Sequence, residues 1–127
     1  MTNVFEAIHD LQNEIYQGNI AAGWWSNLAT GEQRQCGDIE LALSKVSLVH
    51  SEVSEMTEGI RRGLMDDHLP ARPMGEVEAA DAIIRILDLA GYMNWDVGGA
   101  IQDKLAYNKN RADHKIENRM KDGGKKA

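Results

Sequence analysis

Residues 78–90 read Glu-Ala-Ala-Asp-Ala-Ile-Ile-Arg-Ile-Leu-Asp-Leu-Ala, and the predicted fold is built around them. Its isoleucines, leucines and alanines cover most of a helical circumference, which predicts a largely buried helix from about Glu76 to Met93. The polar residues are spaced three, four and three apart and therefore share one face. They are Glu78, Asp81, Arg85 and Asp88. This polar seam faces either solvent or a wet internal cavity.

Three further helices are predicted around this one. The first runs from Asn3 to Gln17 with Gly18 as its stop, and the second runs from the N-cap Asp38 to Arg62 before Gly63. The last runs from Val97 to Ala112 behind the cap Asp96. Residues 18–38 and 65–75 are rich in glycine or proline and are expected to be loops. The predicted fold class is all-α, a four-helix bundle.

The bulk properties fit one small domain with a separate basic end. The chain has 127 residues and a net charge of −6. Residues 104–127 carry eight Lys or Arg against three Asp or Glu, which leaves six positive and 17 negative charges on the rest. Such an acidic body argues against duplex nucleic acid as a partner. The basic end at residues 104–127 is expected either to be solvated or to supply cations to a phosphate group, and its residues 113–127 are expected to form a polar tail.

The location of the protein is predicted from features that the sequence lacks. The sequence contains no run of about 18 apolar residues, so no membrane span is predicted. The first residues lack the basic start and apolar core of a signal peptide. The single cysteine, Cys36, suits a reducing compartment. These features favour a cytoplasmic protein.

Two pairs of carboxylates carry the first chemical signal. Glu52 and Glu55 lie three residues apart on the second predicted helix, and Glu78 and Asp81 are spaced in the same way on the third. If the two helices face each other, four carboxylates converge on a small volume. Such a cluster repels itself unless it holds hard cations. The spacing therefore predicts a magnesium site of the kind that handles phosphates.

A second group lies on the fourth predicted helix. Lys104, Asn108 and Arg111 follow at i, i+4 and i+7 and would share one helical face. An ammonium, an amide and a guanidinium on one face suit a chain of phosphates. The alternative is that the two cations are ordinary solvated residues.

Together these elements resemble the MazG-like superfamily of all-α nucleoside triphosphate pyrophosphohydrolases, which includes dimeric dUTPases and dCTP pyrophosphatases. The resemblance rests on Glu-x-x-Glu at residues 52–55, a spacer of 22 residues, Glu-x-x-Asp at 78–81, and Lys-x-x-x-Asn-x-x-Arg at 104–111. It covers about residues 3–112, so residues 1–112 are expected to form the domain. Residues 23–25, 64–70 and 112–115 look like the branch common in phages and bacteria.

The resemblance implies a reaction and its participants. Glu52, Glu55, Glu78 and Asp81 would hold Mg²⁺, with Mn²⁺ able to substitute, and one of the glutamates could instead be a general base. A nucleoside triphosphate, with a deoxyribonucleotide favoured, would be cleaved between its α- and β-phosphates to a monophosphate and pyrophosphate. Such a reaction serves nucleotide-pool control or house-cleaning. Similar enzymes are homo-oligomers, which implies a tetramer or a dimer that completes the core.

Aromatic residues suggest where the base would bind. Trp24 and Trp25 lie in a glycine-flanked loop, where they are either core anchors or, for one of them, a surface on which a nucleobase stacks. Similar enzymes use the first helix and the following loop for the base, which makes Asn13 and Gln17 candidates for contacts with the base edge.

Two other classes of protein compete with this hypothesis. A di-iron carboxylate protein would use Glu-x-x-His motifs, and Glu6 with His9 is one of these, but the second is missing. A helical interaction module would carry the same carboxylates merely as exposed residues. Magnesium-dependent release of pyrophosphate separates the three.

Overall fold

The computed structural model describes residues 3–127, and every regular element within that range is helical. The elements are listed in chain order: α1 (Val4–Ala21), α2 (Ile39–Arg62), α3 (Met74–Met93), α4 (Val97–Lys109), the 3-10 turn η1 (Ala112–His114) and α5 (Ile116–Arg119). The predicted all-α class is confirmed. The four-helix bundle remains a prediction, because the chain forms two compact units that are described separately: residues 3–9 with Asp96–Ala127, and Asp10–Trp95.

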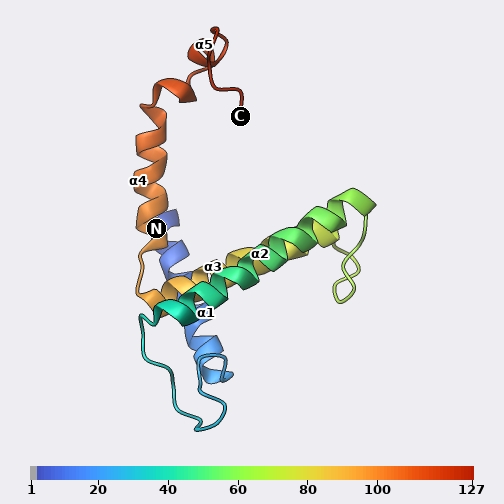
Figure 1. The fold of residues 1–127 in the computed structure, drawn as a ribbon, viewed down its shortest axis with the longest axis vertical. Coiled ribbons are helices and arrows are strands. Elements are labelled where there is room, and N and C mark those ends of the chain that lie inside the picture. The colour runs from blue at the N-terminus through green and yellow to red at the C-terminus, as the bar shows by residue number, and fades with distance from the viewer. Residues whose placement is uncertain (1–2) are drawn as a thin grey trace. The chain divides into compact units, whose positions relative to one another are not determined.

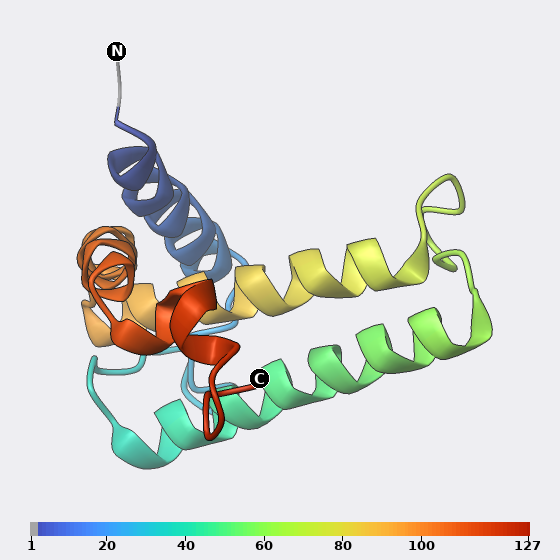
Figure 2. The ribbon, with the colours of Figure 1, turned by 90° about the horizontal axis from the view of Figure 1, so that it is seen from above.

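Helices α2 and α3 form an antiparallel hairpin in the larger unit, and they lie side by side in both ribbon views (Figures 1 and 2). Asp38 caps the start of α2 by accepting a hydrogen bond from the Leu41 amide at 2.9 Å, as predicted. Gly63 ends α2 in the left-handed conformation, at φ 62°. Helices α2 and α3 approach each other closely near the hairpin turn, where a Cβ on Gly59 would lie only 2.9 Å from the side chain of Met74.

Aromatic side chains build the core where α1 meets the hairpin. The ring of Trp25 stacks on Tyr92 at 4.3 Å between centroids and meets the edge of Tyr16 at 5.8 Å. Ala42 and Leu89 complete this buried cluster. The Tyr92 hydroxyl donates to the Gln35 carbonyl at 2.6 Å and accepts from an amide of the same loop. These contacts fix the loop before α2 against α3.

The predicted end of the first helix was wrong. Gly18 does not stop α1, which continues to Ala21 before Gly23 turns the chain at φ 86°. A helical glycine costs only about 1 kcal/mol relative to alanine. Ile20 packs against the aromatic cluster, and this burial outweighs that cost.

The predicted end of the last helix was also wrong. Helix α4 begins behind the predicted cap Asp96 but ends at Lys109 instead of Ala112. Asn110 caps the end and its side chain donates to the Ala106 carbonyl at 3.2 Å. Asparagine competes in this way with helix continuation, because its amide offers the backbone an alternative partner. Arg111 is therefore extended, with φ −77° and ψ 136°.

The tail after residue 112 has more structure than predicted. It contains η1 and α5, and hydrogen bonds close it on itself. The Arg119 guanidinium donates to the carbonyls of Lys125 and Lys126 at 3.1 and 3.0 Å, and the Lys126 ammonium donates back to the Arg119 carbonyl. These bonds satisfy main-chain carbonyls that would otherwise need water.

Part of the apolar surface of the hairpin is uncovered in the single chain. Leu87, Leu89 and Ala90 of α3 are buried, but Ile83 and Ile86 are 55% and 42% exposed. The apolar stripe of α2 is open in the same way, with Val46, Val53 and Ile60 all exposed. The predicted burial of α3 thus holds for one side of the helix only. Within residues 3–127 no helix has both the length and the apolar character needed to cross a membrane.

Candidate active site

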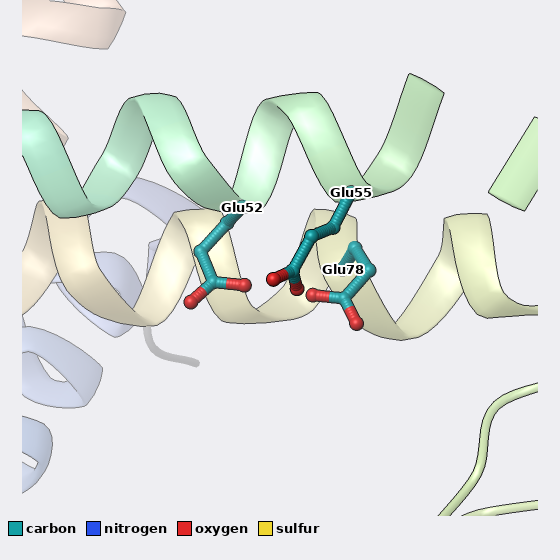
Figure 3. A group of neighbouring side chains, drawn as sticks. All are labelled: Glu52, Glu55 and Glu78. Atoms are coloured by element: carbon teal, nitrogen blue, oxygen red, sulfur yellow. The ribbon is translucent and has the colours of Figure 1, made fainter. Parts of the chain in front are cut away.

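Three of the four predicted metal ligands meet between α2 and α3. Glu52 and Glu55 lie one turn apart on α2, and Glu78 reaches toward them from α3 (Figure 3). Each offers a carboxylate oxygen, and these oxygens all lie within 4.8 Å of one another. Glu52 is 7% exposed, Glu78 is 8% exposed and Glu55 is open to solvent. We call these three residues the carboxylate cluster.

Arg85 forms an ion pair with one member of the carboxylate cluster, Glu52. Its Nε donates to Glu52 Oε1 at 2.7 Å across the two helices. Burial raises the pKa of Glu52, but the hydrogen bond from Arg85, the neighbouring Glu78, the positive charge of Arg85 and the neighbouring Glu55 together hold that pKa below its ordinary value. Glu52 is therefore an ionised carboxylate in a fixed orientation.

Glu78 has the opposite electrostatic environment. Its hydrogen bond with Glu52, its burial and the nearby charge of Glu55 raise its pKa to about 8. Its Oε2 is buried and has no hydrogen-bond partner. A buried carboxylate oxygen without a partner is costly unless a proton or a cation satisfies it. The cluster therefore fits a hard cation, which prefers carboxylate oxygens.

Asp81 lies apart from the carboxylate cluster but close to it. It lines a cavity of about 510 Å³ together with Glu52, Arg85 and Asp88. Leu48 and Ile84 supply apolar walls, and Asn19, Trp24, Trp25, Lys45 and Leu89 complete the lining. Three of the four residues of the polar seam of α3 thus line a cavity, which is open at Trp24, and the fourth, Glu78, belongs to the carboxylate cluster. Glu52 belongs to both the cavity and the cluster, so a ligand in the cavity can reach the carboxylates.

The two tryptophans have different surroundings. Trp25 is 1% exposed, its Nε1 donates to Asp88 Oδ1 at 2.8 Å, and Lys45 Nζ lies 4.6 Å from its ring centroid. Tyr92 covers the same ring, so Trp25 is a core anchor with little surface left for a ligand. Trp24 is 68% exposed and lines the cavity, which leaves its indole free to stack on a planar ring.

The two residues of the first helix that were predicted to contact the base edge do not lie at the cavity. Asn13 and Gln17 are exposed on α1, and neither lines it. Asn19, two residues after Gln17 on α1, does line it. Because α1 continues past Gly18, its last turn supplies the cavity residue that the shorter predicted helix could not.

The predicted phosphate-binding residues belong to the smaller unit. Lys104 and Asn108 lie on α4, where Lys104 Nζ is 4.7 Å from the ring centroid of Tyr107 and Asn108 Oδ1 is buried without a hydrogen-bond partner. Arg111 lies beyond the end of α4 and pairs with Asp113, which raises the pKa of the guanidinium. The prediction that all three share one helical face was wrong, because Asn110 ends the helix first.

Other cavity residues were not predicted as site residues. Lys45 precedes Glu52 by seven residues on α2, and Asp88 follows Asp81 by seven on α3. A spacing of seven keeps residues on one face, so this spacing is the signal that could have identified both. Burial raises the pKa of Asp88, and hydrogen bonds from Trp25 and Asn19 and the charges of Lys45 and Arg85 oppose that rise.

His9, the histidine of the Glu-x-x-His motif, lies beside the carboxylate of Asp96. Its Nδ1 lies 3.8 Å from Asp96 Oδ1, the carboxylate that caps α4. The carboxylate cluster itself contains no histidine.

Comparison with protein-family models, with curated proteins and with solved structures gives no match.

Proposed function

We propose that this protein is a magnesium-dependent nucleoside triphosphate pyrophosphohydrolase. The observation that carries the proposal is the carboxylate cluster, in which a buried oxygen of Glu78 lacks a partner beside two more carboxylates. This cluster opens through Glu52 onto a cavity with an exposed indole. A cation site beside a surface for a planar ring suits a nucleotide.

The proposal gives each residue of the larger unit a role. Glu52, Glu55 and Glu78 would hold the cation, with Asp81 at the adjoining cavity wall. When bound, Mg²⁺ would neutralise phosphate charge and lower the pKa of a water. Arg85 fixes the orientation of Glu52 through its 2.7 Å hydrogen bond. Trp24 would stack on the base.

The phosphate-binding roles of Lys104, Asn108 and Arg111 are part of the same proposal. They rest on side-chain chemistry, since an ammonium and a guanidinium stabilise a leaving pyrophosphate. Asn108 would contribute its side-chain NH₂ group, because phosphate oxygens accept hydrogen bonds and the Oδ1 of Asn108 cannot donate one. The guanidinium of Arg111 already holds a carboxylate, Asp113, which occupies the place that a phosphate would take.

A homo-oligomer, either a tetramer or a dimer, is also proposed. Its support is the apolar surface that α2 and α3 leave open, with Val53, Ile60, Ile83 and Ile86 all exposed. A surface of this kind marks an interface, and closed symmetric assemblies are the usual way to cover it. Under this proposal a neighbouring chain would contribute to the nucleotide pocket.

The test is release of pyrophosphate from a panel of ribo- and deoxyribonucleoside triphosphates, with Mg²⁺ or with a chelator. We expect release with Mg²⁺ or Mn²⁺ and none with the chelator. Asp81→Asn and Glu78→Gln should each lower turnover by at least about 100-fold while helicity is retained. Glu76→Gln is the matched control, because Glu76 is exposed on the same helix and pairs with Arg72.

Three results would count against the proposal. No release from any nucleotide would reject the enzyme. Unchanged turnover of Asp81→Asn would reject the assignment of that residue. Absorption that appears only with iron would instead favour a di-iron protein.

A further inference from the structure

The wall of the cavity beside the carboxylate cluster contains a half-buried acceptor, Asp88. Asp81 and Asp88 both line the cavity and are seven residues apart on α3. Seven residues span about 10 Å along a helix and return to the same face. A sugar and a base can bridge such a span, so a nucleotide with its phosphates near Glu52 and Asp81 places its base near Asp88.

The carboxylate of Asp88 is held in place but retains capacity to accept hydrogen bonds. Trp25 Nε1 donates to its Oδ1 at 2.8 Å. A carboxylate offers about four acceptor positions, so this bond leaves others for a ligand. Because Trp25 is locked between aromatic neighbours, Asp88 has a fixed direction in the cavity wall.

The charge of Asp88 selects among nucleobases. A carboxylate accepts from the exocyclic amino groups of cytosine, adenine and guanine. At the position of that amino group in cytosine, uracil and thymine present the carbonyl oxygen O4, which a carboxylate repels, and their ring N3–H is the single donor left on this edge. The cavity also contains the ammonium of Lys45, but that group lies over the Trp25 ring and is attracted by Asp88 itself.

Building on the proposed function, we infer that Asp88 selects nucleotides whose base carries an exocyclic amino group and that Trp24 stacks on this base. Trp25 positions the carboxylate and does not contact the base itself. The protein therefore prefers cytosine, adenine and guanine nucleotides to those of uracil and thymine.

The sharpest probe is the pair dCMP and dUMP, because they differ at the amino position and at the adjoining ring nitrogen and are otherwise alike. Their dissociation constants are measured by calorimetry with the full chain and without metal, so that the result does not depend on catalysis. We expect dCMP to bind at least about fivefold more tightly than dUMP. Trp24→Ala should weaken both nucleotides by a similar factor, since stacking tolerates any base.

The matched variant is Asp88→Asn, which keeps an acceptor for Trp25 and replaces the charge with an amide that can donate to a carbonyl. We expect the preference for dCMP to disappear or reverse. Asp67→Asn removes a charge from an exposed loop residue outside the cavity and should keep the preference.

The outcomes separate this inference from the proposed function. Equal affinities of the wild-type protein for dCMP and dUMP would overturn the role of Asp88, even if every triphosphate is hydrolysed. A preference for dCMP that survives in folded Asp88→Asn would overturn it as well. A preference for dCMP that Asp88→Asn removes would support it, even if no triphosphate is cleaved and the proposed function fails.

Discussion

Arg85 on α3 donates through Nε to Oε1 of Glu52 on α2 at 2.7 Å. This bond ties the two helices together where the carboxylates are most crowded. It helps to hold the pKa of Glu52 below its ordinary value, whereas the neighbouring Glu78 has its pKa raised to about 8. The carboxylate cluster therefore contains one fixed negative charge and one group that keeps its proton near neutral pH.

The first prediction concerns this ion pair. Without metal, Arg85→Gln leaves the buried carboxylate of Glu52 without its cation, and we expect a loss of about 1–3 kcal/mol in the free energy of unfolding. Mg²⁺ should then raise the melting temperature more in this variant than in the wild-type protein, because the metal replaces the missing charge. Thermal melts with and without Mg²⁺ measure both effects.

Arg72→Gln provides the control for the ion pair. Arg72 and Glu76 form an exposed pair, and its loss should change stability by about 1 kcal/mol or less. Equal melting temperatures for Arg85→Gln and the wild-type protein, each without metal, would contradict the prediction.

The second prediction concerns pH. The hydrogen bond with Glu52, burial and the nearby Glu55 raise the pKa of Glu78 from 4.5 to about 8, so the folded protein binds this proton more tightly than the unfolded chain does. The stability that the proton contributes is complete below about pH 4.5 and is lost as the pH rises through 8. In metal-free protein, stability should fall over this range more steeply for the wild type than for Glu78→Gln.

The same proton should compete with the metal. A cation needs the ionised carboxylate, so its binding releases the proton. The affinity for Mn²⁺ should therefore rise by up to about tenfold per pH unit below 8 and level off above it. Titrations with Mn²⁺ at pH 6, 7 and 8 measure this slope. An affinity that does not change over this range would show that Glu78 is not a ligand.

The third prediction concerns Arg111. If its guanidinium binds the triphosphate, Arg111→Ala should lower kcat/KM by about tenfold or more, since a charge-assisted hydrogen bond is lost. Arg111→Lys should also impair the enzyme, because lysine keeps the charge but not the bidentate fork. Steady-state kinetics of both variants test the assignment, and wild-type kcat and KM in Arg111→Ala would reject it.

Because Arg111 pairs with Asp113, a change at Asp113 should improve substrate binding, whereas the changes at Arg111 should weaken it. Asp113→Asn removes the carboxylate that occupies the guanidinium. We expect KM to fall in this variant, because the phosphate no longer competes with a carboxylate. A rise in KM would mean that Asp113 positions Arg111 for the substrate.

The fourth prediction concerns assembly. Light scattering at micromolar concentration should give a mass of two or four chains, and a mass near the 14.1 kDa of one chain in an active sample would refute the oligomer. Ile83→Lys places a charge on the exposed apolar side of α3 and should shift the protein toward monomer with loss of activity. Ala29→Lys, at an exposed loop position, is the control and should leave the mass unchanged.

Local signals in the sequence determined the helices. Asp38, Gly63 and Asp96 cap or end helices as predicted, because capping depends on a side chain and its nearest backbone groups. The spacing of three placed Glu52 and Glu55 on one face of a helix and Glu78 and Asp81 on one face of the next, which predicted convergence of the carboxylates only if the two helices face each other. Helical periodicity carries such information without any knowledge of the tertiary structure.

The tertiary structure decided which of these residues meet and what state they are in. The sequence could not show that Arg85 would pair with Glu52, that Asp81 would line the cavity beside the cluster, or that Trp25 would be buried while Trp24 is exposed. Each depends on how α1, α2 and the loop between them pack against α3. The raised pKa of Glu78 has the same origin, because burial and crowding of charges exist only after the helices have come together.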